Sequence, residues 1–364
     1  MTYFLFISSI ILGFIFKKSK AVSAYILTSM YLLAAFNYDN YDYFSYTVSY
    51  AKTASTTFDY RYIGYSMFEH LFSARGLTYS EYLKFAFIIV FIVLYYAICK
   101  LTDKPNQVLA LFMIFPFGID AIQLKALFSE VFGLLGIALL FNDMCETKSL
   151  LKNRHLVMTI VCFVLSILFH FSGAFNLAAV VLFFFFRNKR WFNKTVIIAS
   201  LVGFVAVYTG ILGKIISIAG ALGVISDTEY LSSYATKSTN FGFLITFIPV
   251  LLMVGACWLV VREDKKEEQL TIIQLIIRQF VLTGLLVLPL LTMHMVFDRL
   301  ARIYMILMYI LFVNHPRLER LTIKQVSAYV MFVLSISWFF FIDIYSTLDG
   351  TLLAVLNYSE IFGV

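Results

Sequence analysis

Charged residues are scarce in this sequence, making up 13% of its 364 residues, whereas hydrophobic residues make up 61%. A soluble domain ordinarily carries about 25% charged residues. The deficit excludes an ordinary soluble enzyme and indicates a polytopic integral membrane protein. Prolines are few as well, only five, and no proline- or glycine-rich linker or internal repeat divides the chain. We therefore expect a single integral domain over residues 1–364.

Motifs of several common enzyme classes are missing too. The chain has no Walker A sequence, so it does not hydrolyse ATP by that route. It also has no H-E-x-x-H, no G-x-S-x-G, and no D-x-D to hold a metal–nucleotide-sugar complex. Its four cysteines show no C-x-x-C spacing, which argues against a zinc site or a disulfide framework. We predict neither a metal nor a cofactor.

Apolar runs follow one another along most of the chain, and they predict an all-α bundle of about twelve transmembrane helices. Several runs are short against the ~20 residues that a bilayer crossing usually needs. We divide residues 156–186 at His170 because that stretch is too long for one crossing and "HFSG" is typical of a tight turn. The expected spans are 2–16, 21–36, 82–101, 107–122, 124–142, 156–170, 173–186, 194–213, 241–261, 272–293, 300–313 and 326–344.

Basic residues concentrate in alternate loops between these spans, which predicts the orientation in the membrane. Under the positive-inside rule such loops are cytoplasmic. Both termini then lie outside, as do the two longest loops, residues 37–80 and 214–240. The net charge of +7 needs no nucleic-acid partner to explain it. The basic loops are residues 17–20, 100–104, 148–155, 187–194, 262–266 and 317–324.

Ionisable residues gather at the predicted outer ends of the spans, and such residues at membrane depth are functional candidates. Arg299 and Arg302 are three apart and share a helix face, and Asp298 is placed to pair with Arg302. The structural alternative is a set of interfacial charges that reach the lipid headgroups. The candidates are Asp39, Asp42, Arg61, Glu69, His70, Asp120, Lys125, Glu130, His170, Asp298, Arg299 and Arg302.

Three of these positions have further alternatives. Asp42, Tyr46 and Tyr50 recur every four residues, which predicts a helix face with a carboxylate and two phenols suited to sugars, or an interfacial aromatic belt. Lys125 is either a ligand for an anion or the partner of Glu130 in an ion pair between helices. His170 is either functional or bonded to a backbone carbonyl at the helix break.

Short motifs follow one another in a fixed order along the chain. They are Asp42, Tyr46 and Tyr50, then Gly64 and Tyr65, then His170 and Ser172 in "HFSGAF", and finally Arg299 and Tyr304 in "RLARIY". In this order they resemble the motifs of the EpsG-like branch of the Wzy-type polysaccharide polymerases. The chain lacks the Glu and Pro of the family's E-P-G-Y element, has Lys125 where the family has the arginine of I-R-Q, and has Asn357 in place of a late proline.

The resemblance implies a GT-C-like membrane glycosyltransferase of the bacterial cytoplasmic membrane. Such an enzyme joins undecaprenyl-diphosphate-linked oligosaccharide repeat units on the outer face, without a metal, to build capsule, exopolysaccharide or O-antigen. A flippase and a chain-length regulator are the expected protein partners.

The resemblance and the residue chemistry together suggest roles for the candidate residues. Fixed cations stabilise the charge that develops on a diphosphate leaving group. The attacking sugar hydroxyl needs a base or an orienting acceptor, for which His170 and Asp42 are both candidates. We expect the diphosphate at Arg299, Arg302 and Lys125, with Arg299 also taking part in catalysis, and the glycan at Arg61, Tyr46, Tyr50, Tyr65 and Tyr304.

Two other functions stay open. A flippase or transporter of the same lipid-linked glycan also needs cations in the membrane, but we would expect them along a path through it, often with an internal repeat. Here the charges gather at one face, with Arg278 as the exception. A single-addition glycosyltransferase or ligase differs from a polymerase only in its product.

Overall fold

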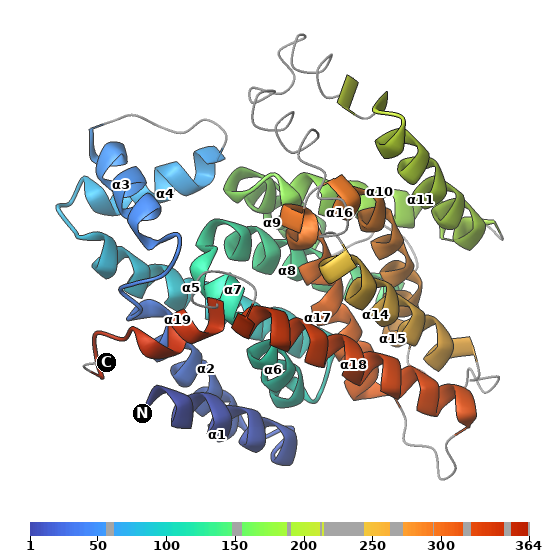
Figure 1. Ribbon diagram of the computed structural model, residues 1–364, viewed down its shortest axis with the longest axis horizontal. Helices are drawn as coiled ribbons and strands as arrows, with labels where there is room; N and C mark the ends of the chain where they lie inside the picture. The colour runs from blue at the N-terminus through green and yellow to red at the C-terminus, as the bar shows by residue number, and fades with distance from the viewer. Residues whose placement is uncertain are drawn as a thin grey trace. The chain divides into compact units, whose positions relative to one another are not determined.

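The computed structural model describes residues 1–55, 62–147, 155–187, 191–211, 213–214, 244–262, 272–293, 295–315, 322–345 and 351–362 (Figure 1). Apart from an isolated bridge between Asn37 and Ser359, these residues form helices and connecting turns. The helices are α1 (Thr2–Ile15), α2 (Lys20–Ala35), α3 (Tyr43–Ala54), α4 (Ile63–Ser73), α5 (Tyr79–Leu101), α6 (Pro105–Ile114), α7 (Phe117–Ile122), α8 (Leu124–Thr147), α9 (Leu156–Phe169), α10 (Ser172–Phe186), α11 (Phe192–Tyr208), α14 (Leu244–Arg262), α15 (Ile272–Val281), η4 (Leu282–Val287), α16 (Leu288–Met293), η5 (Met295–Asp298), α17 (Arg299–Asn314), α18 (Ile323–Tyr345) and α19 (Thr351–Asn357).

Long apolar helices confirm the polytopic membrane class. Four of the described helical stretches are long and apolar enough to cross a bilayer, and seven shorter apolar helices accompany them. The described residues of each of the twelve apolar runs are mainly helical. The number of helices that cross the membrane and their orientation stay predictions. The four long stretches are Tyr79–Leu101, Leu124–Cys145, Ile272–Met293 and Ile323–Tyr345.

The break at His170 is confirmed, since α9 ends at Phe169 and α10 begins at Ser172. The turn between them requires glycine at position 173. A Cβ there would lie 2.4 Å from the carbonyl carbon of Ser166, which is backbone and has no room to move. The "HFSG" sequence therefore folds α10 tightly back beside the end of α9.

The single helix predicted over residues 107–122 was wrong, because α6 and α7 divide it at Phe115 and Pro116. Proline supplies no N–H to a helix and disfavours the helical conformation in the residue before it. Phe115 is accordingly extended, with φ −164° and ψ 136°. The hydrophobicity of this run predicted one helix, and the effect of Pro116 was not taken into account.

Local signals explain where other helices begin. Thr78 and Glu81 form a capping box at the start of α5. The Thr78 hydroxyl accepts the Glu81 N–H at 3.3 Å, and the Glu81 carboxylate accepts the Thr78 N–H at 2.8 Å. Pro105 is the first residue of α6, a position where its missing N–H costs no hydrogen bond.

The helices group into two compact units. The first unit comprises Met1–Leu177, Phe312–Asn314 and Phe339–Val364. Within it α8 packs against α9 and α5, α1 packs against α2 and α6, and α3 packs against α4 (Figure 1). The Ser166 hydroxyl of α9 donates to the Ser129 carbonyl of α8 at 2.6 Å. Such small polar residues let membrane helices approach closely and bond to one another.

The second unit comprises Ala178–Leu311 and His315–Trp338. Here α11 and α14 both pack against η4 and α16. Pro249 lies inside α14, so the carbonyl of Ile245, one turn earlier, loses its helical N–H donor. The indole N–H of Trp338 in α18 donates to that carbonyl at 2.9 Å. A residue distant in sequence thus satisfies the backbone group that proline leaves open.

This arrangement predicts that Trp338→Phe lowers the free energy of unfolding by about 1 kcal/mol, because the Ile245 carbonyl loses its donor. In a Pro249→Ala protein, the backbone N–H of Ala at position 249 can donate to the Ile245 carbonyl. Trp338→Phe should then lower the free energy of unfolding by clearly less. Thermal unfolding of the purified protein measures both values. Trp191→Phe is the matched control, since Trp191 is 44% exposed and Trp338 is 46% exposed. If Trp338→Phe lowers the free energy of unfolding equally with Pro249 and with alanine at that position, Trp338 does not replace the donor that Pro249 removes.

Candidate functional site

Lys125 lies among three tyrosine rings in the first unit. Its Nζ is 5.0 Å from the ring centre of Tyr46, 5.1 Å from that of Tyr62 and 4.9 Å from that of Tyr65. Tyr46 comes from α3, Tyr62 immediately precedes α4, and Tyr65 lies in its first turn. We call Lys125, these tyrosines and His170 the Lys125 cluster. The faces of aromatic rings attract a cation electrostatically, so the cluster holds a positive charge in place.

The position of Lys125 is electrostatically unusual. It is the second residue of α8, and the N-terminus of a helix carries a partial positive charge that disfavours a cation by about 0.3–1 kcal/mol. The tyrosine rings offset this cost. The helix end and the ammonium group together form a locally positive environment, which attracts an anion.

His170 extends the same cluster. Its ring stacks on Tyr62, with centroids 5.4 Å apart and planes within 2° of parallel, and the residue is only 1% exposed. The Nδ1 atom accepts the backbone N–H of Ser172 at 3.3 Å and lies 2.9 Å from the Ser172 hydroxyl oxygen. The ring therefore bonds to Ser172, the first residue of α10, through Nδ1.

This bond assigns the tautomer of His170. An Nδ1 atom that accepts a backbone N–H carries no proton, so the proton of the neutral ring is on Nε2. In this state Nε2 is a hydrogen-bond donor and does not accept a proton. The geometry thus favours His170 as an orienting donor over His170 as a base.

Asp42, Tyr46 and Tyr50 do share one face of α3, as predicted. The Tyr46 ring lies 6.4 Å from that of Tyr65, and the Tyr50 ring lies 5.3 Å from that of Tyr82 in α5. Asp42 is at the start of α3, and its carboxylate does not cap the helix. Tyr46 is half-buried, whereas Tyr50 and Tyr65 are 5% and 0% exposed.

Glu69 is a fully buried carboxylate near this face. Burial, and then the charges of Glu69 and Glu81, raise the pKa of Tyr50 to about 12. Tyr50 therefore stays protonated at neutral pH and donates to the Leu77 carbonyl at 2.9 Å. Burial also raises the pKa of Tyr65, with a contribution from Glu69. These two phenols are fixed parts of the packing.

Gly64 allows the Tyr62–Tyr65 turn to approach α9. A Cβ at this position would lie 2.8 Å from the Leu168 Cβ and 3.0 Å from its carbonyl oxygen. A larger residue would push α4 away from α9. Gly64 therefore keeps Tyr62 close to His170, which directly follows α9.

Asp298, Arg299 and Arg302 form the arginine cluster, which belongs to the second unit. Arg302 Nη2 donates to Asp298 Oδ2 at 3.1 Å, and the two side chains are 1% and 16% exposed. The predicted pairing is therefore confirmed. Arg299, the first residue of α17, is half-buried, and its Nε atom is buried with no hydrogen-bond partner among the described residues. Of the two arginines, Arg299 is the one accessible to a ligand.

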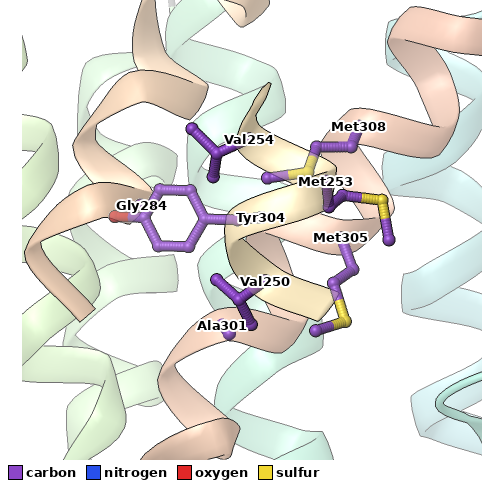
Figure 2. Close-up of a pocket in the computed structure, with 8 residues that line it drawn as sticks. All are labelled: Val250, Met253, Val254, Gly284, Ala301, Tyr304, Met305 and Met308. Carbon is purple, nitrogen blue, oxygen red and sulfur yellow. The ribbon is translucent and has the colours of Figure 1, made fainter. Parts of the chain in front are cut away.

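Tyr304 lies deeper in the same unit and is 1% exposed. Its hydroxyl accepts the Thr283 hydroxyl at 3.2 Å, and its ring stacks on Phe280 at 5.5 Å. Figure 2 shows the ring between Val250 and Val254, beside an apolar cavity of about 10 Å³. That volume holds one water molecule at most. The geometry argues against the glycan contact predicted for Tyr304 and gives it a packing role.

Three residues of the first unit differ from the prediction: Tyr62 was not predicted, Glu69 was predicted only as an ionisable candidate, and Arg61 cannot be compared. Tyr62 was overlooked because it stands outside the every-fourth-residue tyrosine pattern. Glu69 was noted only as an ionisable residue, although it is four after Tyr65 and so on the same helix face. Arg61 lies outside the described residues. In the described part of the chain, no group of three or more His, Cys, Asp or Glu side chains is arranged to hold a metal ion.

Several residues on which the resemblance was based thus lie in the two clusters, namely Tyr46, Tyr65 and His170 in the Lys125 cluster and Arg299 in the arginine cluster. No curated protein and no solved structure matches the chain. The family model described as the EpsG family matches residues 20–359, which is essentially the whole chain. The chain therefore belongs to the EpsG family, a family of Wzy-like polymerases.

Proposed function

We propose that the protein joins undecaprenyl-diphosphate-linked oligosaccharide repeat units into a polysaccharide on the outer face of the bacterial cytoplasmic membrane. The observation that carries this proposal is the family match over residues 20–359. The two clusters support it, because each presents a cation at the N-terminus of a helix. The polymer would be a capsule, an exopolysaccharide or an O-antigen, with a flippase and a chain-length regulator acting beside the enzyme.

In the proposed reaction, a hydroxyl oxygen of the incoming lipid-linked unit attacks the anomeric carbon of the growing chain. A new glycosidic C–O bond forms as the C–O bond to the diphosphate breaks. The electron pair of the broken bond leaves on undecaprenyl diphosphate, and the hydroxyl proton passes to a base. No oxidant or reductant takes part, and the reaction as proposed uses the cations of the chain in place of a metal.

Lys125 and Arg299 are the proposed diphosphate ligands. Lys125 combines its own charge with the partial positive charge at the α8 N-terminus. Arg299 occupies the first position of α17, and a guanidinium group can bond two phosphate oxygens at once. Arg302 would contribute by fixing the start of α17 through Asp298.

Asp42 is the proposed base, with His170 as the orienting donor. Asp42 precedes Tyr46 by about one turn on the same face of α3, and Tyr46 belongs to the Lys125 cluster. Tyr46 and Tyr62 are half-buried, so part of each is left to contact a sugar. Tyr50 and Tyr65, which were predicted to bind glycan directly, are buried and would hold the accessible rings in position.

The roles of His170 and Asp42 can be separated by substitution. His170→Gln keeps a side-chain N–H donor and should retain much more polymerisation than His170→Ala. Asp42→Asn removes the proton acceptor and should reduce the rate by about a hundredfold or more. Product formation from lipid-linked repeat units by purified variants measures both. If His170→Gln is as inactive as His170→Ala while Asp42→Asn is near normal, the two assignments are reversed.

Cells that lack the protein test the function without knowledge of the sugars. We expect polymer to disappear and single lipid-linked repeat units to accumulate on the outer leaflet, where a membrane-impermeant periodate label reaches them. A flippase would instead leave these units protected on the inner leaflet. Accumulation of protected units, corrected by restoring the protein, would contradict the proposed polymerase.

A further inference from the structure

A second and larger cavity, of about 300 Å³, lies within the second unit and takes no part in the function proposed above. Its polar lining comes from Asn193, Arg278 and Gln279, and its apolar lining includes Trp258, Leu275 and Leu282. Asn193 is exposed and Trp258 is 46% exposed, so the cavity reaches the surface of the protein. Arg278 is also the cation that did not fit the gathering of charges at the predicted outer face.

The cavity lies at the basic end of the second unit. Gln279 Nε2 donates to the Arg187 carbonyl at 2.6 Å, which joins α15 to the turn that follows α10. Asn193 is the second residue of α11. Arg187 and Asn193 both belong to the basic stretch 187–194, one of those predicted to be cytoplasmic.

The depth of Arg278 suits a lipid headgroup. It is six residues into the predicted span that begins at residue 272, which corresponds to roughly 9 Å of helix. A long, flexible side chain at this depth reaches the level of the lipid phosphates. The charged residue in the described lining is an arginine.

We propose that this cavity binds the phosphate headgroup of an anionic glycerophospholipid of the inner leaflet. The Arg278 guanidinium would hold the phosphate, for which its planar fork is well suited. The amide groups of Asn193 and Gln279 border the headgroup, while Leu275, Leu282 and Trp258 contact the start of the acyl chains. A cavity of this volume accommodates a headgroup, and the chains extend into the surrounding bilayer. Basic pockets between helices on the cytoplasmic side are typical sites for anionic headgroups.

Trp258 offers a local probe of this site. The full-length protein is reconstituted in vesicles of phosphatidylcholine or phosphatidylglycerol whose chains are brominated near the headgroup, because bromine quenches tryptophan fluorescence on contact. The difference between the protein and its Trp258→Phe variant isolates the signal of Trp258 from that of Trp191 and Trp338. We expect about a fivefold preference of the Trp258 site for phosphatidylglycerol.

Arg278→Gln should abolish this preference, and Arg278→Lys should keep part of it because the charge remains. Arg187→Gln is the matched control. Arg187 is at the same basic end but does not line the cavity, so this variant should keep the full preference. Unchanged quenching of Trp191 and Trp338 in all variants verifies their fold.

Three results would overturn the proposal. Equal quenching by the two lipids would show that the site does not select an anion. If Arg187→Gln and Arg278→Gln lose the preference for phosphatidylglycerol equally, the preference reflects the overall positive charge of this surface and not the cavity. Stronger displacement by undecaprenyl phosphate than by phosphatidylglycerol, at equal mole fraction, would assign the site to the polyprenyl lipid.

Discussion

Replacing Arg299 by alanine is expected to abolish polymer while leaving the protein folded in the membrane. Arg299 is half-buried, begins α17, and has a buried Nε atom with no hydrogen-bond partner in the described residues, so its loss breaks no described ion pair. If it stabilises the charge on the departing diphosphate, its removal should reduce the rate by about a hundredfold or more. Polymer yield in cells and turnover by the purified variant measure the effect.

Two further variants make this result interpretable. Arg299→Lys keeps the charge but loses the bidentate geometry, so we expect intermediate activity. Arg75→Ala is the matched control, because Arg75 is an exposed arginine predicted to lie on the same face of the membrane. Normal polymer length in Arg299→Ala would refute the assignment.

Asp298→Asn should destabilise the protein strongly, by roughly 3–5 kcal/mol. Arg302 is completely buried, and its guanidinium bonds to the Asp298 carboxylate. Without that carboxylate, a buried positive charge is left at the N-terminus of α17, where the helix dipole also disfavours it. The midpoint of thermal unfolding in detergent reports the loss.

A second substitution separates stability from catalysis. Replacing Arg302 by methionine in the Asp298→Asn protein removes the buried positive charge that Asp298 had paired, so most of the stability should return. Activity should not return to the same extent, because the start of α17 is no longer fixed beside Arg299. If the double variant is as unstable as Asp298→Asn, loss of the Asp298–Arg302 ion pair is not the cause of the destabilisation.

Much of the helical architecture could be predicted from the sequence, because it depends on local chemistry. Hydrophobic runs predicted the helices, and the length of residues 156–186 predicted the break at His170. The spacing of Asp298 and Arg302 predicted their ion pair, since side chains four apart on a helix are neighbours. The family was recognisable for the same reason, because its motifs are short and local.

The remaining features depend on contacts between residues far apart in the chain. No local pattern indicates that Tyr46 and Tyr62 lie over Lys125, or that Trp338 bonds the carbonyl left open by Pro249. The burial of Tyr304 was equally hidden, since "RLARIY" looks the same whether its tyrosine meets a sugar or packs on Phe280. The spacing of the tyrosines in the sequence thus predicted that they share one helix face. It did not predict which of their rings are accessible to a sugar.

The most direct test of the polymerase is its product. Purified protein is reconstituted in liposomes with a lipid-linked oligosaccharide repeat from its own pathway, and the products are separated on a gel. We expect a ladder whose bands are spaced by one repeat unit, together with release of undecaprenyl diphosphate, and no ladder with Arg299→Ala. A single added unit, or movement of the substrate across the bilayer without any product, would contradict the proposed function.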